Sequence, residues 1–216
     1  MSIDDPRDDD PPATLPGTPC PFLRCAINPD NEADTGVAPL VAGRTSVGQL
    51  YAHARAHSNS RLFGVIVAGV GLMGNGLGPS GLWRNLVTLS FDAAALTGGP
   101  LDKPKADTRI LQARGEGRFC RDYFDVMLDR WGRQFTPEGG NTTERGLDLA
   151  AIRSMVATRR REDDGNSLTA LAAYGEFVPS LWLFGKRSTS GARYLAEQDL
   201  LAMFRDMRFP RSAASR

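Results

Sequence analysis

The sequence predicts a mainly α protein with a single domain, and three observations support this fold class. The chain has 216 residues, a length that one hydrophobic core can serve. Its apolar residues recur mostly at helical spacing, in one segment after another. Alternation of apolar and polar residues is scarce, and residues 85–91 are the best candidate for a strand. We therefore expect helices to build the core.

Five amphipathic segments predict surface helices of this core. Thr45 or Ser46 can cap the first, whose apolar residues follow at helical spacing. The others cover residues 119–131, 143–159, 167–174 and 195–207. Residues 61–73 are apolar nearly all round, which predicts a buried helix.

Composition excludes several classes of protein. Lys and Arg total 26 against 25 Asp and Glu, so the net charge of +1 argues against a broad basic surface for nucleic acid or anionic lipid. With two histidines and three cysteines, a zinc ribbon or a multi-histidine centre is hard to build. The apolar run 62–73 is too short to span a bilayer. No secretory signal is visible, so a cytoplasmic location is the default expectation.

The two ends of the chain are predicted to lie outside the domain. Residues 1–17 are rich in Asp and Pro and poor in apolar side chains, which predicts a disordered leader. The folded domain is expected over residues 18–210, followed by a tail over residues 211–216.

Cys20 stands between two prolines, and this setting suits an anionic sulfur ligand. Proline is favoured at the first position of a helix, so a helix beginning at Pro21 would have Cys20 as its N-cap. The N–H groups and the positive dipole at a helix start favour a thiolate over a thiol. An incidental cysteine in a turn is the alternative on spacing alone. Cys25 and Cys120 are expected to be free structural thiols.

A glycine motif offers a rival interpretation. Gly69, Gly71 and Gly74 form a G-x-G-x-x-G pattern, and Asp92 follows a second apolar stretch, as in dinucleotide-binding folds. Against this, Pro79 falls inside the helix that such a fold requires, at a cost of about 3 kcal/mol. A nicotinamide-dependent oxidoreductase stays open as an alternative.

His53 and His57 are spaced to share one helix face. No third metal ligand is signalled nearby, and Arg55 between them indicates a solvated face, so we expect surface histidines.

Glu176 is a carboxylate within the otherwise apolar residues 168–184. Burial raises the pKa of a carboxyl group and suits it to proton transfer.

Taken together, these segments resemble the haem-thiolate peroxidase family, which includes the chloroperoxidases and the unspecific peroxygenases. Pro19-Cys20-Pro21 resembles the proximal motif, whose cysteine binds haem iron. Residues 173–176 resemble the distal segment, whose glutamate is the acid–base residue that splits peroxide. The helix 119–130 and the run that ends at residues 208–210 resemble family segments in the same order. The resemblance covers about residues 18–210.

The resemblance implies a haem b cofactor, hydrogen peroxide as oxidant and an apolar or aromatic organic substrate. Cys20 would be the axial iron ligand and Glu176 the distal acid–base residue. Apolar side chains are expected to surround the haem and the substrate: Phe63, Ile66 and Val70 at the cofactor, and Leu168, Ala172 and Phe177 in the substrate pocket.

The chain departs from the family at the acidic motif that binds magnesium beside a haem propionate. One register places Asp102 at the magnesium-binding glutamate, with Thr108-Arg109 as the pair that follows. Asp102 offers a suitable hard oxygen ligand. A second register places Lys105 there, which would abolish the metal site.

The cation that accompanies the distal glutamate is also altered. The two family positions for a His or an Arg hold Lys103 and Thr169 in this chain. A cation keeps the glutamate ionised and stabilises the charge that develops as the O–O bond breaks. Either Lys103 serves this role, or Glu176 works without a charged partner. The second case leaves a non-catalytic haem-binding protein as a further alternative.

Overall fold

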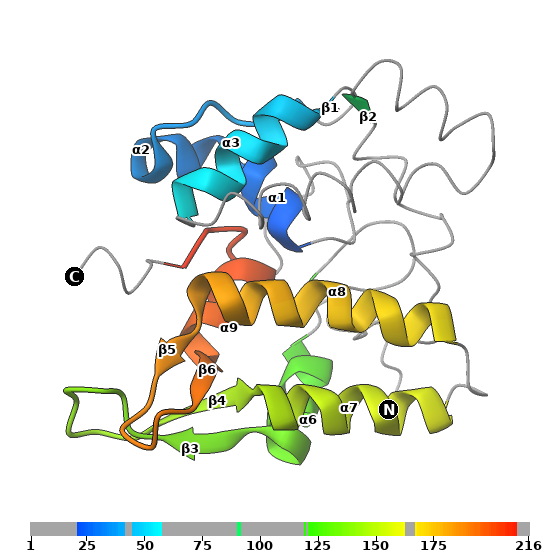
Figure 1. Cartoon of the computed structure of the whole chain (residues 1–216), viewed down its shortest axis with the longest axis vertical. Coiled ribbons are helices and arrows are strands. Elements are labelled where there is room, and N and C mark those ends of the chain that lie inside the picture. The colour runs from blue at the N-terminus through cyan, green and yellow to red at the C-terminus, as the bar shows by residue number, and fades with distance from the viewer. Residues whose placement is uncertain are drawn as a thin grey trace.

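A computed structural model describes residues 21–41, 45–57, 90–91, 119, 121–162 and 167–210. More than half of these residues lie in helices, which confirms the mainly α prediction for this part of the chain (Figure 1). A small antiparallel sheet accompanies the helices and was not predicted. The predicted leader 1–17, the tail 211–216 and the predicted buried helix 61–73 fall outside the described residues.

The helices follow the predicted order, with different boundaries. Their bounds are α1 Pro21–Ile27, the 3-10 helix η1 Pro29–Asn31, α2 Glu32–Thr35, α3 Val47–His57, α6 Arg121–Trp131, α7 Leu149–Glu162, α8 Ser167–Phe184 and α9 Glu197–Phe204. Three expectations need correction: α7 begins at Leu149, α9 begins at Glu197, and α8 continues ten residues beyond Tyr174, past Pro179. None of the described helices has the length and apolar character needed to cross a membrane.

Ser46 caps α3, as the sequence predicted. Its Oγ accepts a hydrogen bond from the N–H of Gln49 at 3.1 Å, and Gln49 Oε1 accepts one from the N–H of Ser46 at 3.3 Å. This reciprocal pair is a capping box, which satisfies two backbone donors at the helix start. Directly before α3, the strand β1 Thr45–Ser46 pairs antiparallel with β2 Ser90–Phe91. The predicted strand 85–91 is therefore confirmed at its last two residues.

Two hairpins form the sheet, in the order β3-β4-β6-β5. The strands are β3 Arg133–Phe135, β4 Glu144–Asp148, β5 Lys186–Arg187 and β6 Arg193–Ala196. Backbone hydrogen bonds also join the chain after β3 to β5 and the residues that follow it: Glu138 N–H donates to Arg187 O at 2.8 Å, and Thr189 N–H donates to Thr136 O at 2.9 Å. The sheet thereby nearly closes on itself around the stacked rings of Phe135 and Tyr194, whose centroids are 4.3 Å apart.

Leu147 and Leu195 were expected on helices, but they form a cross-strand pair between β4 and β6. Both are fully buried, so their apolar character is compatible with either structure. Asp148 decides where the strand stops, because its Oδ1 accepts a hydrogen bond from the N–H of Ala151 at 2.7 Å. An aspartate that bonds three residues ahead is a helix N-cap, so α7 begins at the next residue.

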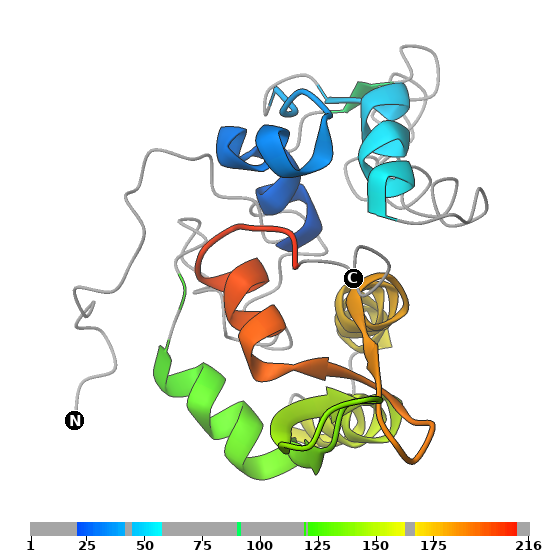
Figure 2. The same cartoon turned by 90° about the vertical axis from the view of Figure 1, so that its left-hand side faces the viewer.

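The core lies where the helices meet the sheet. Helices α7 and α8 run side by side, α8 contacts β6, and α1 lies over α8 and α9 (Figure 1, Figure 2). The largest fully buried side chains of the described residues include Phe124, Met127, Leu147, Ile152, Met155, Phe177, Phe184 and Phe204. This main apolar cluster joins α1 at one end of the chain to α9 at the other.

We predict that Gly146→Ala lowers the stability of the fold by about 2 kcal/mol, in the range typical of overpacking. A Cβ at this position in β4 would collide with the backbone carbonyl of Leu195 and lie 2.9 Å from the ring of Tyr194. A carbonyl in a sheet cannot move aside without breaking the strand pairing. Chemical denaturation of both proteins measures the loss.

Gly48→Ala is the matched control, since Gly48 is exposed on α3 and its Cβ would meet only Ser46 Oγ, at 4.0 Å. We expect this variant to be as stable as the parent or up to about 1 kcal/mol more stable. Equal effects of the two substitutions would contradict the close approach at Gly146.

Candidate functional site

The described part of the chain begins with helix α1, at Pro21, so Cys20 and its predicted role as the helix cap lie outside the described residues. All seven residues of α1 are buried, including Arg24. The side chain of Cys20 lies outside the described residues. Cys25, within the same helix, is fully buried and forms no disulfide, as predicted, and its Sγ donates to the carbonyl oxygen of Met203 at 3.8 Å.

Helix α8 carries the second predicted motif. The backbone of Glu176 lies in the second half of this helix, and Leu168 and Ala172 precede it on the same helix. The side chains at these three positions are outside the described part of the structure. Phe177, predicted in the substrate pocket, is buried, and its ring stacks on that of Phe204 of α9 with centroids 5.7 Å apart.

The helices that carry the two motifs pack against each other. Helix α1 contacts both α8 and α9, so the segment that follows Cys20 lies against the helix that contains Glu176. An aromatic cluster extends this packing: the ring of Phe209 lies 5.3 Å from that of Phe22 and 5.9 Å from that of Phe184. Phe209 belongs to the last segment of the family resemblance. The fold thus brings three of the resembling segments together.

Two buried asparagines fix the C-terminal run, which we define as residues 206–210. The amide groups of Asn28 and Asn31 both donate to the carbonyl oxygen of Met207, at 3.0 and 2.8 Å. Asn31 also donates to Cys25 O at 2.7 Å and accepts from the N–H of Phe209 at 3.1 Å. Met207 has a φ of 52°, a left-handed conformation that is costly for a residue with a side chain. The asparagines stabilise this turn and hold the run against α1.

His53 was expected at the surface, and this expectation is wrong. Its side chain is 1% exposed. The ring Nε2 lies 3.0 Å from the carbonyl oxygen of Ala38, and the ring centroid lies 6.1 Å from that of Phe209. Burial lowers the pKa of His53, against the opposing effect of the Ala38 carbonyl. Arg55 had indicated a solvated face on α3, and His53 does not lie on that face.

Several predicted site residues lie outside the described part of the chain. They are Phe63, Ile66, Val70, Asp102, Lys103 and Cys120, together with Gly69, Gly71, Gly74 and Asp92 of the rival glycine motif. Within the described residues, no group of three or more His, Cys, Asp or Glu side chains could hold a metal ion.

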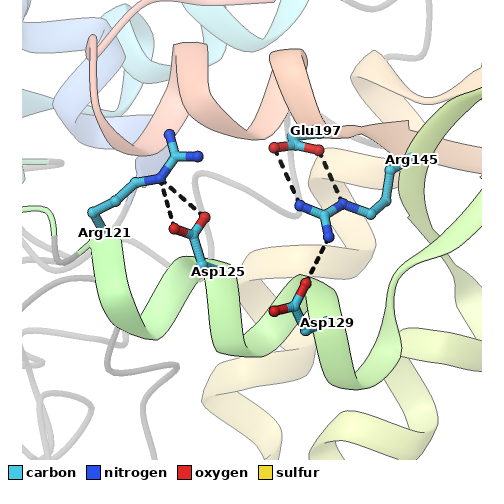
Figure 3. A network of polar contacts seen from close by, with 5 residues as sticks. All are labelled: Arg121, Asp125, Asp129, Arg145 and Glu197. Atoms are coloured by element: carbon cyan, nitrogen blue, oxygen red, sulfur yellow. Dashed lines mark hydrogen bonds and ion pairs between the residues drawn. The ribbon is translucent and has the colours of Figure 1, made fainter.

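The sequence analysis missed an ionic network that connects α6, β4 and α9 (Figure 3). Arg145 of β4 makes a two-pronged contact with Glu197, at 3.0 and 3.4 Å, and also donates to Asp129 Oδ1 at 2.7 Å. Arg121 and Asp125 pair along α6 at 2.9 Å. The hydrogen bond to Glu197 is the main reason why the pKa of Arg145 is raised. The network fixes the first turn of α9 on the sheet.

A second polar cluster lies between the sheet and α9. Glu144 accepts a hydrogen bond from the hydroxyl of Tyr194 at 2.6 Å and from Lys186 Nζ at 3.1 Å. Lys186 Nζ is also 3.5 Å from Asp199 Oδ2, which has no hydrogen-bond partner. Burial raises the pKa of Tyr194, so its hydroxyl stays protonated and remains a donor. Because the cation and the donor are already engaged by these two carboxylates, we assign the cluster a structural role and not a catalytic one.

Comparison with protein-family models, with curated proteins and with solved structures finds no match to this chain.

We predict that Asp199→Asn stabilises the protein at neutral pH. Burial raises the pKa of Asp199 more than Lys186 lowers it, so the fold disfavours the ionised form. The native state then binds more protons than the unfolded state above the ordinary pKa of 3.8, and stability falls as pH rises through that range. Thermal unfolding should show a higher midpoint for the variant at pH 7 and a smaller difference near pH 4.

Asp129→Asn serves as the comparison, because the Asp129 side chain is 72% exposed and its pairing with Arg145 faces solvent. We expect this variant to change stability by less than about 1 kcal/mol. A lower unfolding midpoint for Asp199→Asn at pH 7 would mean that the ion pair with Lys186 outweighs the burial of the charge.

Proposed function

We propose that the protein is a haem-thiolate peroxidase or peroxygenase, an oxidoreductase that uses hydrogen peroxide to oxidise an apolar or aromatic organic substrate. The observation that carries the proposal is the packing of α1, which begins directly after Cys20, against α8, which contains Glu176. The resembling segments are far apart in the sequence, and a shared site requires the fold to bring them together. The contact of Phe209 with Phe22 adds the third segment.

The chemistry of the available donors fits a thiolate-bound haem. Cys20 precedes the first turn of a fully buried helix, where a thiolate is favoured over a thiol. Cys25 is a poor alternative, because its thiol points into the core and bonds to Met203 O. In this proposal, Phe63, Ile66 and Val70 surround the cofactor, and Asp102 is a potential magnesium ligand beside it. Cys20 would hold the haem iron through its thiolate, and the haem would supply the redox chemistry of peroxide cleavage.

Glu176 would move the proton in this reaction. Its carboxylate would take the proton from one oxygen of hydrogen peroxide and return it to the other oxygen, which leaves as water. Lys103 is the candidate for the positive charge that keeps Glu176 ionised. Leu168 and Ala172 precede Glu176 at helical spacing on the same face of α8, so an apolar substrate would bind beside the proton carrier. Phe177 would support this face from the core, where its ring stacks on that of Phe204.

The nicotinamide alternative gains no support from the described residues. A dinucleotide-binding unit needs parallel pairing of the strand that ends near Asp92. The last two residues of that stretch, Ser90 and Phe91, pair antiparallel with β1. We therefore develop the haem-thiolate proposal alone.

We predict that the purified, haem-loaded protein, once reduced and exposed to carbon monoxide, has the strongly red-shifted Soret band of thiolate ligation. Cys20→Ala should lose this band, because the axial sulfur is removed. Cys25→Ala should keep it, which controls for the loss of a cysteine as such. An unshifted Soret band in the parent protein, or an unchanged spectrum in Cys20→Ala, would refute the assignment.

Glu176→Gln separates an enzyme from a haem-binding protein without activity. We expect the variant to bind haem with the parent spectrum and to lose turnover of peroxide by about 10²- to 10⁴-fold, the range for removal of a general acid–base group. Glu138→Gln, at an exposed position after β3, should leave turnover unchanged. Product formation is followed with a panel of apolar and aromatic substrates. Equal turnover of Glu176→Gln and parent would exclude the proposed role of Glu176.

A further inference from the structure

His53 is buried in α3 with one ring nitrogen unsatisfied. The carbonyl of Ala38 can only accept a hydrogen bond, so Nε2, 3.0 Å away, carries the ring hydrogen. Nδ1 then carries a lone pair and no hydrogen, and it has no hydrogen-bond partner in the described part of the chain. The ring lies instead next to the aromatic ring of Phe209. His53 is thus held as a neutral ring, and the described residues around it provide no hydrogen-bond acceptor for a second ring N–H.

Protonation would make this arrangement unfavourable. It places a hydrogen on Nδ1, and a buried donor without an acceptor is unfavourable, more so when the group is charged. The bond from Nε2 to Ala38 survives, because Nε2 carries a hydrogen in both forms. The unfavourable contact is therefore at Nδ1, between its new hydrogen and the groups that pack around this side of the ring. The lowered pKa of His53 agrees with this geometry.

The C-terminal run is the part of this packing that can move at the lowest cost. It places Phe209 next to His53 and is held to α1 and η1 through Met207 O and the N–H of Phe209. Met207 adopts the left-handed φ of 52°, so leaving the bound conformation relieves backbone strain. Movement of α3 would instead disturb the pairing of β1, which directly precedes this helix, with β2.

We infer that His53 is an acid-sensitive latch, whose protonation releases the C-terminal run from α1 and α3. Release exposes the ring to water and uncovers Phe22 of α1. The inference concerns the fold alone and does not depend on the proposed haem chemistry, although α1 is the helix that follows Cys20.

His57, four residues further along α3, is the other histidine of the chain, so the test includes a variant at that position. The charged and titratable residues of the described elements around His53 are Arg24 and Cys25 of α1, Asp30 of η1, Glu32 and Asp34 of α2, and Tyr51, Arg55 and His57 of α3, together with Arg205 directly after α9 and Asp206 and Arg208 of the run. The loop 36–41 contributes none. Asp206 pairs with Arg205 at 2.6 Å, and Arg208 lies 3.6 Å from Asp30.

The test is an NMR titration of the full-length chain combined with amide hydrogen exchange. The chain has two histidines, so two sets of ring C–H signals report directly on both. We expect the His53 signal to titrate below its ordinary pKa of 6.5. Over the same range, protection of the Phe209 amide should fall by about tenfold or more, after correction for intrinsic exchange. The Arg205 amide, bonded to Leu201 O at the end of α9, should keep its protection.

Two matched substitutions assign the effect. His53→Gln keeps an N–H donor for Ala38 but does not titrate, so protection of Phe209 should no longer depend on pH. His57→Gln should behave as the parent. The inference is overturned if Phe209 stays protected in the parent while His53 titrates, if release persists in His53→Gln, or if the Phe209 and Arg205 amides open together. If His53→Gln fails to fold, the pH titration of the parent protein is sufficient to test the inference.

Discussion

The complete burial of α1 is the constraint on which the rest of the fold depends. A helix of seven residues is too short to be stable by itself, so its stability must come from the elements that enclose it. Helices α8 and α9 cover it, and the C-terminal run completes the cover through Phe209. At its far end, Cys25 O accepts a hydrogen bond from the side chain of Asn31. Asn28 and Asn31 also donate to Met207 O, which is 179 and 176 positions away from them in the chain. Attachment of the run therefore completes the burial of the helix.

This arrangement couples parts of the chain that the sequence separates widely. The sheet provides the second link, because β4 and β6 pair although they belong to different hairpins. Arg145 and the cluster around Lys186 then fix α9 on that sheet, and α9 in turn carries Met203 against Cys25. A disturbance at the start of α9 reaches α1 through these contacts. Such a fold is expected to unfold cooperatively, since no described helix closes the core alone.

Local signals in the sequence predicted the local features well. Ser46 as a helix cap, the amphipathic helix at α6 and the helix start at Pro21 follow from patterns within a few residues. Leu147 and Leu195 were misassigned because an apolar residue in a short run is compatible with a strand or a helix, and their pairing joins distant segments. Asp148 carried a cap signal that could have corrected the boundary of α7. The burial of His53 has no local signal, since Ala38 and Phe209 enclose it only in the tertiary structure.

The enclosure of α1 also matters for the proposed iron ligand, because Cys20 directly precedes this helix in the sequence. A metal ligand needs support from a rigid element, and a fully buried helix such as α1 has a fixed orientation. Here the orientation is set by Phe22 against Phe209, by Cys25 against Met203 and by the contact with α8. Release of the C-terminal run would remove the first of these and leave the other two. Acid would then loosen the support of the candidate ligand while the packing of α1 on the helix of Glu176 persists, so the two proposals act on one helix through separate contacts.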